Sequence, residues 1–138
     1  MRSTDVVVDS SPLYALIDRR DGYHQRMVAF IERRCFRLLT TLAAITEVAY
    51  LLRASRESQL AFLRWVRAGG VQIIDLTDDD LDHSIDIMVK YGDLRPDFAD
   101  ATLVAIADRL QINRIATFDR DFDVYRYRNR ARFRNVLR

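Results

Sequence analysis

The segment from Asp97 to Phe122 constrains the fold more than any other, because it joins a helix, a strand and an acidic turn. Pro96 suits the first turn of a helix, where its missing N–H group costs nothing. Apolar residues then recur at helical spacing as far as Leu110, and residues 114–117 follow as a short strand. Carboxylates therefore stand at the start of a helix and again at the end of a strand. Both sets face one cleft if the strand belongs to a parallel sheet.

The same alternation of short apolar strands and amphipathic helices runs through the rest of the chain. Strands are expected at residues 5–9, 36–40, 71–74 and 114–117, with helices between them. This order is typical of an α/β protein, with a central, mainly parallel sheet flanked by helices in an α/β/α arrangement. A chain of 138 residues with 49% hydrophobic residues is long enough for one core, so we expect a single domain over residues 1–138.

Hydrophobic periodicity also predicts which face of each helix is buried. The expected inward positions are Leu60, Leu63 and Trp65 on a helix at residues 59–68, and Leu81, Ile85 and Met88 on a helix capped by Thr77.

The charges behind the net charge of +2 are unevenly distributed along the chain, since residues 126–138 contain six arginines and no acid. Within this segment, arginines at even positions from 126 to 134 alternate with other residues, which is typical of a half-buried edge strand. A basic tail on an acidic body suits an anionic partner, or a tail that folds back on its own acidic surface. Two interpretations stay open for Arg126, Arg128 and Arg130: contact with RNA, or pairing with an acidic protein surface.

Cysteine use and hydropathy indicate the compartment. The single Cys35 cannot form an internal disulfide, which fits a reducing cytosol. The sequence has no apolar run long enough to span a bilayer and no charged-then-apolar leader. We expect a cytoplasmic protein without a membrane partner.

Carboxylates recur at comparable places in the predicted topology, at the carboxyl edge of the sheet where ligands bind in open α/β folds. Asp9 ends the first strand, Glu47 lies on the helix after the second, Asp97 and Asp100 open a late helix, and Asp119 and Asp121 follow the fourth strand. Oxygen ligands select hard cations such as Mg²⁺ or Mn²⁺. A bound cation would relieve the repulsion among the acids, polarise a phosphoryl oxygen and generate a hydroxide nucleophile.

Other chemistries have less support in the sequence. His24 and His83 lie on helices that look exposed, so no Ser/His/Asp set is expected, and no Gly-rich phosphate loop is present. Each acid alone also has a structural interpretation; Asp9, for example, stands where a helix N-cap is expected. An aspartyl-nucleophile phosphatase would place a second Asp two residues after the first, where this chain has Ser11.

Three motifs together resemble the PIN domain, and most closely the VapC-type toxins of bacterial toxin–antitoxin pairs. They are VVVDSSPLYALID, TTLAAITEVAYLL and DFADATLVAIADRL with IATFDRDF, in this order along essentially the whole chain. The resemblance implies a ribonuclease that depends on Mg²⁺ or Mn²⁺, with its acids at the carboxyl edge of a parallel sheet. The implied partners are an RNA substrate, a cognate antitoxin and a second copy of the chain.

Carried over residue by residue, the resemblance implies roles for specific side chains. The implied metal-binding and catalytic acids are Asp9, Glu47, Asp100 and Asp119, with Asp97 as an additional acid and Asp121 as a competitor to Asp119. The implied supporting hydroxyls are those of Ser10, Thr46 and Thr117. The alternative is a PIN-like module that binds RNA or protein without cutting, and the presence of all four acids argues against it.

Overall fold

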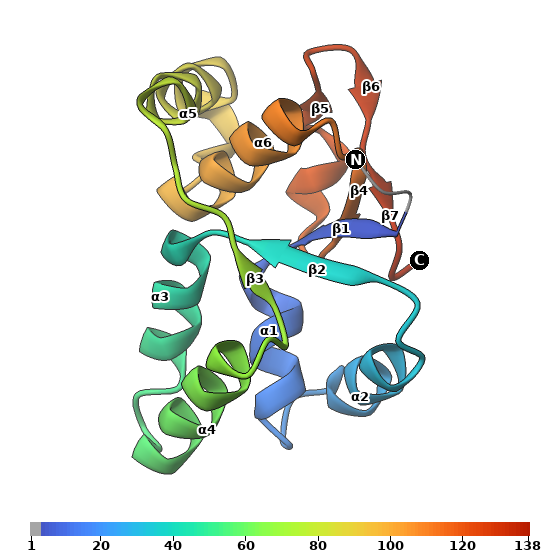
Figure 1. Ribbon diagram of the computed structural model, residues 1–138. Helices are drawn as coiled ribbons and strands as arrows, with labels where there is room; N and C mark the ends of the chain where they lie inside the picture. Colours follow the sequence, from blue (N-terminus) through green and yellow to red (C-terminus); the bar gives the residue numbers. More distant parts are fainter. Residues whose placement is uncertain (1–3) are drawn as a thin grey trace.

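A central sheet of five strands organises the computed structural model, which describes residues 4–138. Its strands are β1 (Asp5–Val8), β2 (Arg37–Thr40), β3 (Gln72–Ile73), β4 (Arg114–Ala116) and β7 (Arg134–Asn135). They lie in the order β3-β2-β1-β4-β7, and every neighbouring pair is parallel (Figure 1). Each of the four predicted strands is present with its ends within one residue of the expected positions.

Helices cover both faces of this sheet. They are α1 (Ser10–Ile17), α2 (His24–Glu32), α3 (Leu42–Leu51), α4 (Arg56–Arg67), α5 (Asp78–Lys90) and α6 (Phe98–Leu110). Figure 1 shows α5 and α6 on one side of the sheet and α1 to α4 on the other. Short 3-10 helices, η1 (Gly92–Leu94) and η2 (Arg120–Asp123), follow α5 and β4. The predicted α/β/α class is confirmed.

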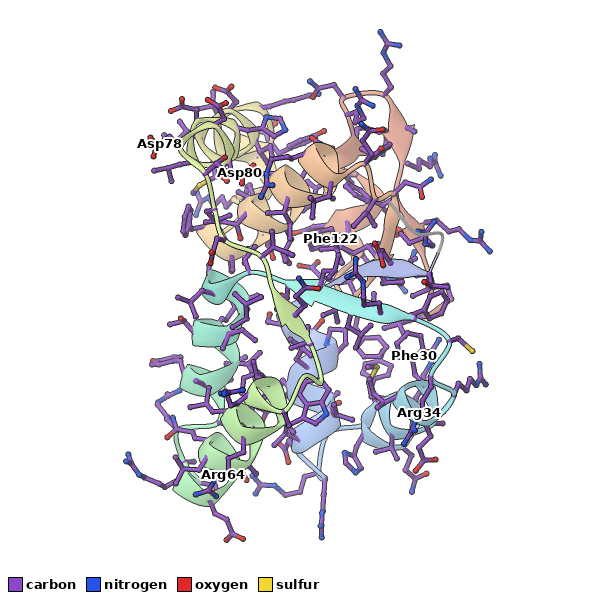
Figure 2. The ribbon with its side chains drawn as sticks, viewed as in Figure 1. Phe30, Arg34, Arg64, Asp78, Asp80 and Phe122 are labelled. Atoms are coloured by element: carbon purple, nitrogen blue, oxygen red, sulfur yellow. The ribbon has the colours of Figure 1, made fainter. Side chains whose placement is uncertain are left out.

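The valine run of β1 shows why the sheet is covered on both faces. Successive side chains of a strand point to opposite faces. Val7 joins the core beneath α6, which includes Phe122, whereas Val6 and Val8 join the core that holds Leu13 of α1. Figure 2 places Phe122 on the α6 side of the sheet. A continuous run of buried valines therefore serves two cores at once.

The predicted inward faces of α4 and α5 are wrong. On α4 the buried side chain is Phe62, and Leu60 and Leu63 are exposed, although Trp65 packs against the core as expected. On α5 the predicted stripe of Leu81, Ile85 and Met88 is exposed as well.

Polar contacts with α6 explain the orientation of α5. The Arg109 Nε–H group donates to both carboxylate oxygens of Asp80, each at 3.0 Å, and His83 Nε2 lies 2.6 Å from Asp108 Oδ2. Figure 2 shows Asp80 on the side of α5 that faces α6, with Asp78 on the outer side. These partners on α6 satisfy polar side chains that the periodicity assigned to solvent.

The arginine-rich C-terminal segment is not the single edge strand that its alternation predicted. Strands β5 (Arg126–Tyr127) and β6 (Ala131–Arg132) form a separate antiparallel hairpin, and β7 then adds to the central sheet beside β4. Arg128 and Asn129 reverse the chain with positive φ angles of 50° and 61°. Two consecutive left-handed residues break the alternation of an extended strand. Among the described residues, no helix is both long and apolar enough to cross a membrane.

Candidate active site

Asp9 is held by two neighbouring strands at the carboxyl edge of the sheet. It directly follows β1 and caps α1, where its Oδ1 atom accepts a 2.7 Å hydrogen bond from the Ser10 N–H group. Its Oδ2 atom accepts a 2.8 Å hydrogen bond from the Thr117 hydroxyl, which directly follows β4. Burial raises the pKa of Asp9 to about 6, although these two hydrogen bonds favour the ionised form.

Asp100 approaches the same point from the first turn of α6. Its N–H group donates a 2.9 Å hydrogen bond to Oδ1 of Asp97, which caps the helix. Asp100 as a residue is only 9% exposed. Burial, followed by the negative charge of Asp9 and other nearby carboxylates, raises the pKa of Asp100 to about 8.

Asp119 completes a cluster of three acids. Its N–H group donates a 2.9 Å hydrogen bond to the Thr117 hydroxyl. One carboxylate oxygen each from Asp9, Asp100 and Asp119 lies within 4.8 Å of the other two. Because β1 and β4 are parallel neighbours, with Val8 paired to Ala116, the residues that follow them meet at one edge.

Glu47 faces this cluster from α3. Its carboxylate accepts a hydrogen bond from the Ser10 hydroxyl, and burial together with the charges of Asp97 and Asp9 raises its pKa. Glu47, Asp97 and the three clustered acids line one cavity of about 320 Å³. The structure thus brings the four predicted acids to one place, with the predicted hydroxyls of Ser10 and Thr117 bonded to them.

The geometry distinguishes Asp119 from its competitor. Asp121 donates its N–H group to Asp119 Oδ1 at 2.9 Å and does not line the cavity. Asp119, by contrast, belongs to the three-acid cluster.

Thr46 is not where the resemblance implied. Its hydroxyl donates a 2.8 Å hydrogen bond to the Leu42 carbonyl on the exposed side of α3, so it does not support the carboxylates. On a helix, the residue next to Glu47 points in a different direction from it.

The arginines proposed for RNA contact lie on the β5–β6 hairpin. The Arg128 N–H group donates to Asp108 Oδ1 at 2.7 Å, and the Arg126 side chain donates to the carbonyls of Asp123 and Val124. Asp108 belongs to the last turns of α6, whereas Asp100 belongs to the first. Roughly 12 Å of helix therefore separates the hairpin contact from the acids.

Several side chains at the site were missed from the sequence. Tyr14, Tyr23 and Phe118 line the same cavity. The Tyr125 hydroxyl is buried and has no hydrogen-bond partner among the described protein atoms. Burial, and then the negative charge of Asp100, raises the pKa of Tyr125. Two of them carried a sequence signal, since Phe118 stands between Thr117 and Asp119 and Tyr14 lies within the first of the three motifs.

The donor set fits a hard divalent cation. Three carboxylate oxygens within 4.8 Å can bind one ion and leave its other positions open to water or substrate. Burial first, and then the charges of neighbouring carboxylates, raise the pKa values of Asp9 and Asp100, and a bound cation would offset both effects. Such a site can activate water and polarise a phosphoryl group.

Comparisons with known proteins agree with this geometry. Ribonuclease VapC26 of Mycobacterium tuberculosis is 28% identical over 117 residues, which cover 83% of this chain and 87% of that protein. The crystal structure of Mycobacterium tuberculosis VapC20, described as a sarcin-ricin loop cleaving toxin, has the same fold: the TM-score is 0.77 at 21% identity, over 86% of this chain and 93% of that one. The family model of the PIN domain matches residues 6–126. The chain therefore belongs to the PIN domain family, and VapC proteins are among its relatives.

Proposed function

We propose that the protein is an endoribonuclease that depends on Mg²⁺ or Mn²⁺ and hydrolyses RNA phosphodiester bonds. The observation that carries this proposal is the convergence of Asp9, Asp100 and Asp119, whose carboxylate oxygens lie within 4.8 Å of one another. The similarity to a protein named as a ribonuclease supports RNA as the substrate.

Each residue of the site has a part in the proposed reaction. When bound, the divalent ion supplies a hydroxide nucleophile near neutral pH and stabilises the charge on the phosphate and on the leaving 3′ oxygen. Asp9, Asp100 and Asp119 would hold the ion. Thr117 fixes the orientation of Asp9 through its 2.8 Å hydrogen bond. Glu47, which accepts a hydrogen bond from Ser10 and lines the same cavity, would orient the attacking water.

We propose a biological role as the toxin of a toxin–antitoxin pair, acting in the cytoplasm and inhibited by a cognate antitoxin. The motif resemblance to VapC-type toxins and the similarity to VapC26 support this role. We also propose that residues 1–138 form one domain, of which residues 1–3 lie outside the described part.

We further propose that two copies associate through the outward faces of α4 and α5. The α5 face exposes Leu81, Ile85, Met88 and Val89 among Asp78, Asp79, Asp82 and Asp86, and the α4 face exposes Leu60 and Leu63 among Arg56, Arg64 and Arg67. In Figure 1, α5 lies above the sheet and α4 below it, both toward the left of the view, and Figure 2 labels Asp78 and Arg64 on them. The two faces are apolar in part and opposite in charge. A two-fold axis would set α5 of each copy against α4 of the other.

Cleavage of total RNA tests the proposed activity. Purified protein free of antitoxin is incubated with RNA and Mg²⁺ or Mn²⁺, beside an EDTA control and the Asp9→Asn variant. We expect discrete fragments that are absent from both controls. Intact RNA in every lane, from protein shown to be folded, would favour a PIN-like module that binds without cutting.

A further inference from the structure

Two stacked aromatic rings stand at the rim of the carboxylate cavity. Tyr23, in the turn before α2, and Phe118, after β4, have ring centroids 3.9 Å apart and planes inclined by 9°. Both residues line the cavity that holds the acids. Phe118 lies between Thr117, which is bonded to Asp9, and Asp119, so the chain itself fixes the pair beside the proposed metal site.

Tyr23 stays accessible to solvent although it is stacked. Phe118 covers one side of the Tyr23 ring, yet Tyr23 as a residue remains 47% exposed, so the accessible part lies away from Phe118. Phe118 is half-buried and packs against the core, so it supports Tyr23 from behind. An aromatic ring that is backed on one side and open on the other is the geometry on which an unpaired nucleobase stacks.

Arg26 brings positive charge to the same rim. Its guanidinium carbon lies 5.7 Å from the centroid of the Phe118 ring. Within residues 4–138, no hydrogen bond or ion pair engages this side chain, and the residues that line the cavity include several acids and no arginine or lysine. An uncommitted arginine beside an aromatic platform suits the phosphate of the nucleotide whose base is stacked there.

We propose that Tyr23, Phe118 and Arg26 form a subsite for an unpaired nucleotide next to the scissile phosphate. The Tyr23 ring stacks on the base and the Arg26 guanidinium binds the adjoining phosphate. A base inside a duplex has no free face for Tyr23, so the substrate at this position is single-stranded or looped-out RNA. This inference rests on the proposed function and names the class of RNA that the site accepts.

A fluorescent base reports this stacking without any need for cleavage. The probe is an oligouridine strand with one central 2-aminopurine, whose fluorescence is quenched when the base stacks. This probe is titrated with the Asp9→Asn protein in the presence of Mg²⁺. In this background, Tyr23→Phe keeps the quenching, whereas Tyr23→Leu abolishes it and weakens binding by about 5- to 100-fold. Arg26→Gln weakens binding. It also reduces the slope of log affinity against log salt concentration by about one, as expected for the loss of one phosphate contact.

Tyr50→Leu is the matched control. Tyr50 is a 60% exposed tyrosine with the Arg53 guanidinium 3.9 Å from its ring centroid, but it does not line the cavity. We expect this variant to bind and quench like the unsubstituted background. Thermal melting of each variant confirms that it is folded before it is compared.

Two results would overturn the subsite. One is equal quenching and affinity in the Tyr23→Leu and Tyr50→Leu proteins. The other is equal affinity for the single strand and for the same strand annealed to its complement. If only the proposed nuclease activity is wrong, the results differ from these. The probe then still binds and its fluorescence is still quenched through Tyr23, but the unsubstituted protein does not cut RNA.

Discussion

The Thr117 hydroxyl donates a 2.8 Å hydrogen bond to Asp9 Oδ2, and the same oxygen atom of Thr117 accepts a 2.9 Å hydrogen bond from the Asp119 N–H group. One threonine thus connects two of the three acids in the proposed metal site. It lies after β4, whereas Asp9 lies after β1, so the connection depends on the parallel pairing of these strands.

Thr117→Val is expected to weaken Mn²⁺ binding about 10- to 100-fold, because it releases the carboxylate that Thr117 orients. Isothermal titration calorimetry measures this affinity. Thr46→Val is the matched control, since the Thr46 hydroxyl donates to the Leu42 carbonyl on the exposed side of α3. Similar affinities for both variants would show that the Thr117 hydrogen bond does not support the site.

Asp119 and Asp121 are expected to differ sharply when each is changed to Asn. Asp119 contributes an oxygen to the three-acid cluster, whereas Asp121 lies outside the cavity. Asp119→Asn should lower Mn²⁺ affinity by at least about tenfold, because it removes a charged ligand, and Asp121→Asn should retain most of it. Mn²⁺ electron paramagnetic resonance gives both values. The reverse order would assign the fourth acid to Asp121.

In EDTA, the free energy of unfolding is expected to fall as pH rises from about 4 to about 8. The pKa of Asp9 is raised to about 6 and that of Asp100 to about 8. In this interval the folded protein keeps protons that the unfolded chain releases, so rising pH favours unfolding.

Urea unfolding at several pH values measures this effect, and Asp100→Asn should flatten the upper part of the curve, between about pH 6 and 8. Saturating Mg²⁺ should offset the loss, because the ion binds the ionised acids of the folded state. Metal-free protein that is more stable at pH 8 than at pH 5 would contradict the burial of uncompensated acids.

Tyr125→Phe is expected to raise the free energy of unfolding by about 1 kcal/mol, because it removes a buried hydroxyl that has no protein partner. The aromatic contacts of Tyr125 with Tyr91 and Phe122 remain available to phenylalanine. Urea unfolding in EDTA tests this change. A loss of stability of similar size would mean that bound water satisfies the hydroxyl.

Ile85→Asp is expected to give a monomer, because it places a charge at the centre of the apolar α5 face. Light scattering after size-exclusion chromatography measures the mass. Val124→Asp is the control, since Val124 is also exposed but lies at the end of η2. A dimer that survives Ile85→Asp and dissociates in the control would place the interface elsewhere.

The strands and the acids were predictable because their signals are local. The valine run of β1 and the Asp residues that follow β1 and β4 reflect backbone preferences and short spacings. Pro96, predicted in the first turn of α6, lies instead just before the N-cap residue Asp97. Parallel topology then dictates that residues after neighbouring strands meet, which is how Asp9 and Asp119 come together.

The buried face of α5 and the aromatic stack at the site were not predicted, because they depend on partners that are distant in the sequence. The inward face of α5 is set by Arg109 on α6, which pairs with Asp80 and leaves Ile85 in solvent. The Tyr23–Phe118 stack likewise joins the turn before α2 to the end of β4. Periodicity describes one helix at a time, so it cannot identify such partners.

The most direct test of the metal-dependent nuclease is to follow Mn²⁺ binding and RNA cleavage in the same titration. We predict that the Mn²⁺ concentrations at half-saturation and at half-maximal cleavage coincide, and that both shift upward together in Thr117→Val. RNA cleavage that persists in EDTA, or that is unchanged when Asp9, Asp100 or Asp119 is replaced by Asn, would contradict the account.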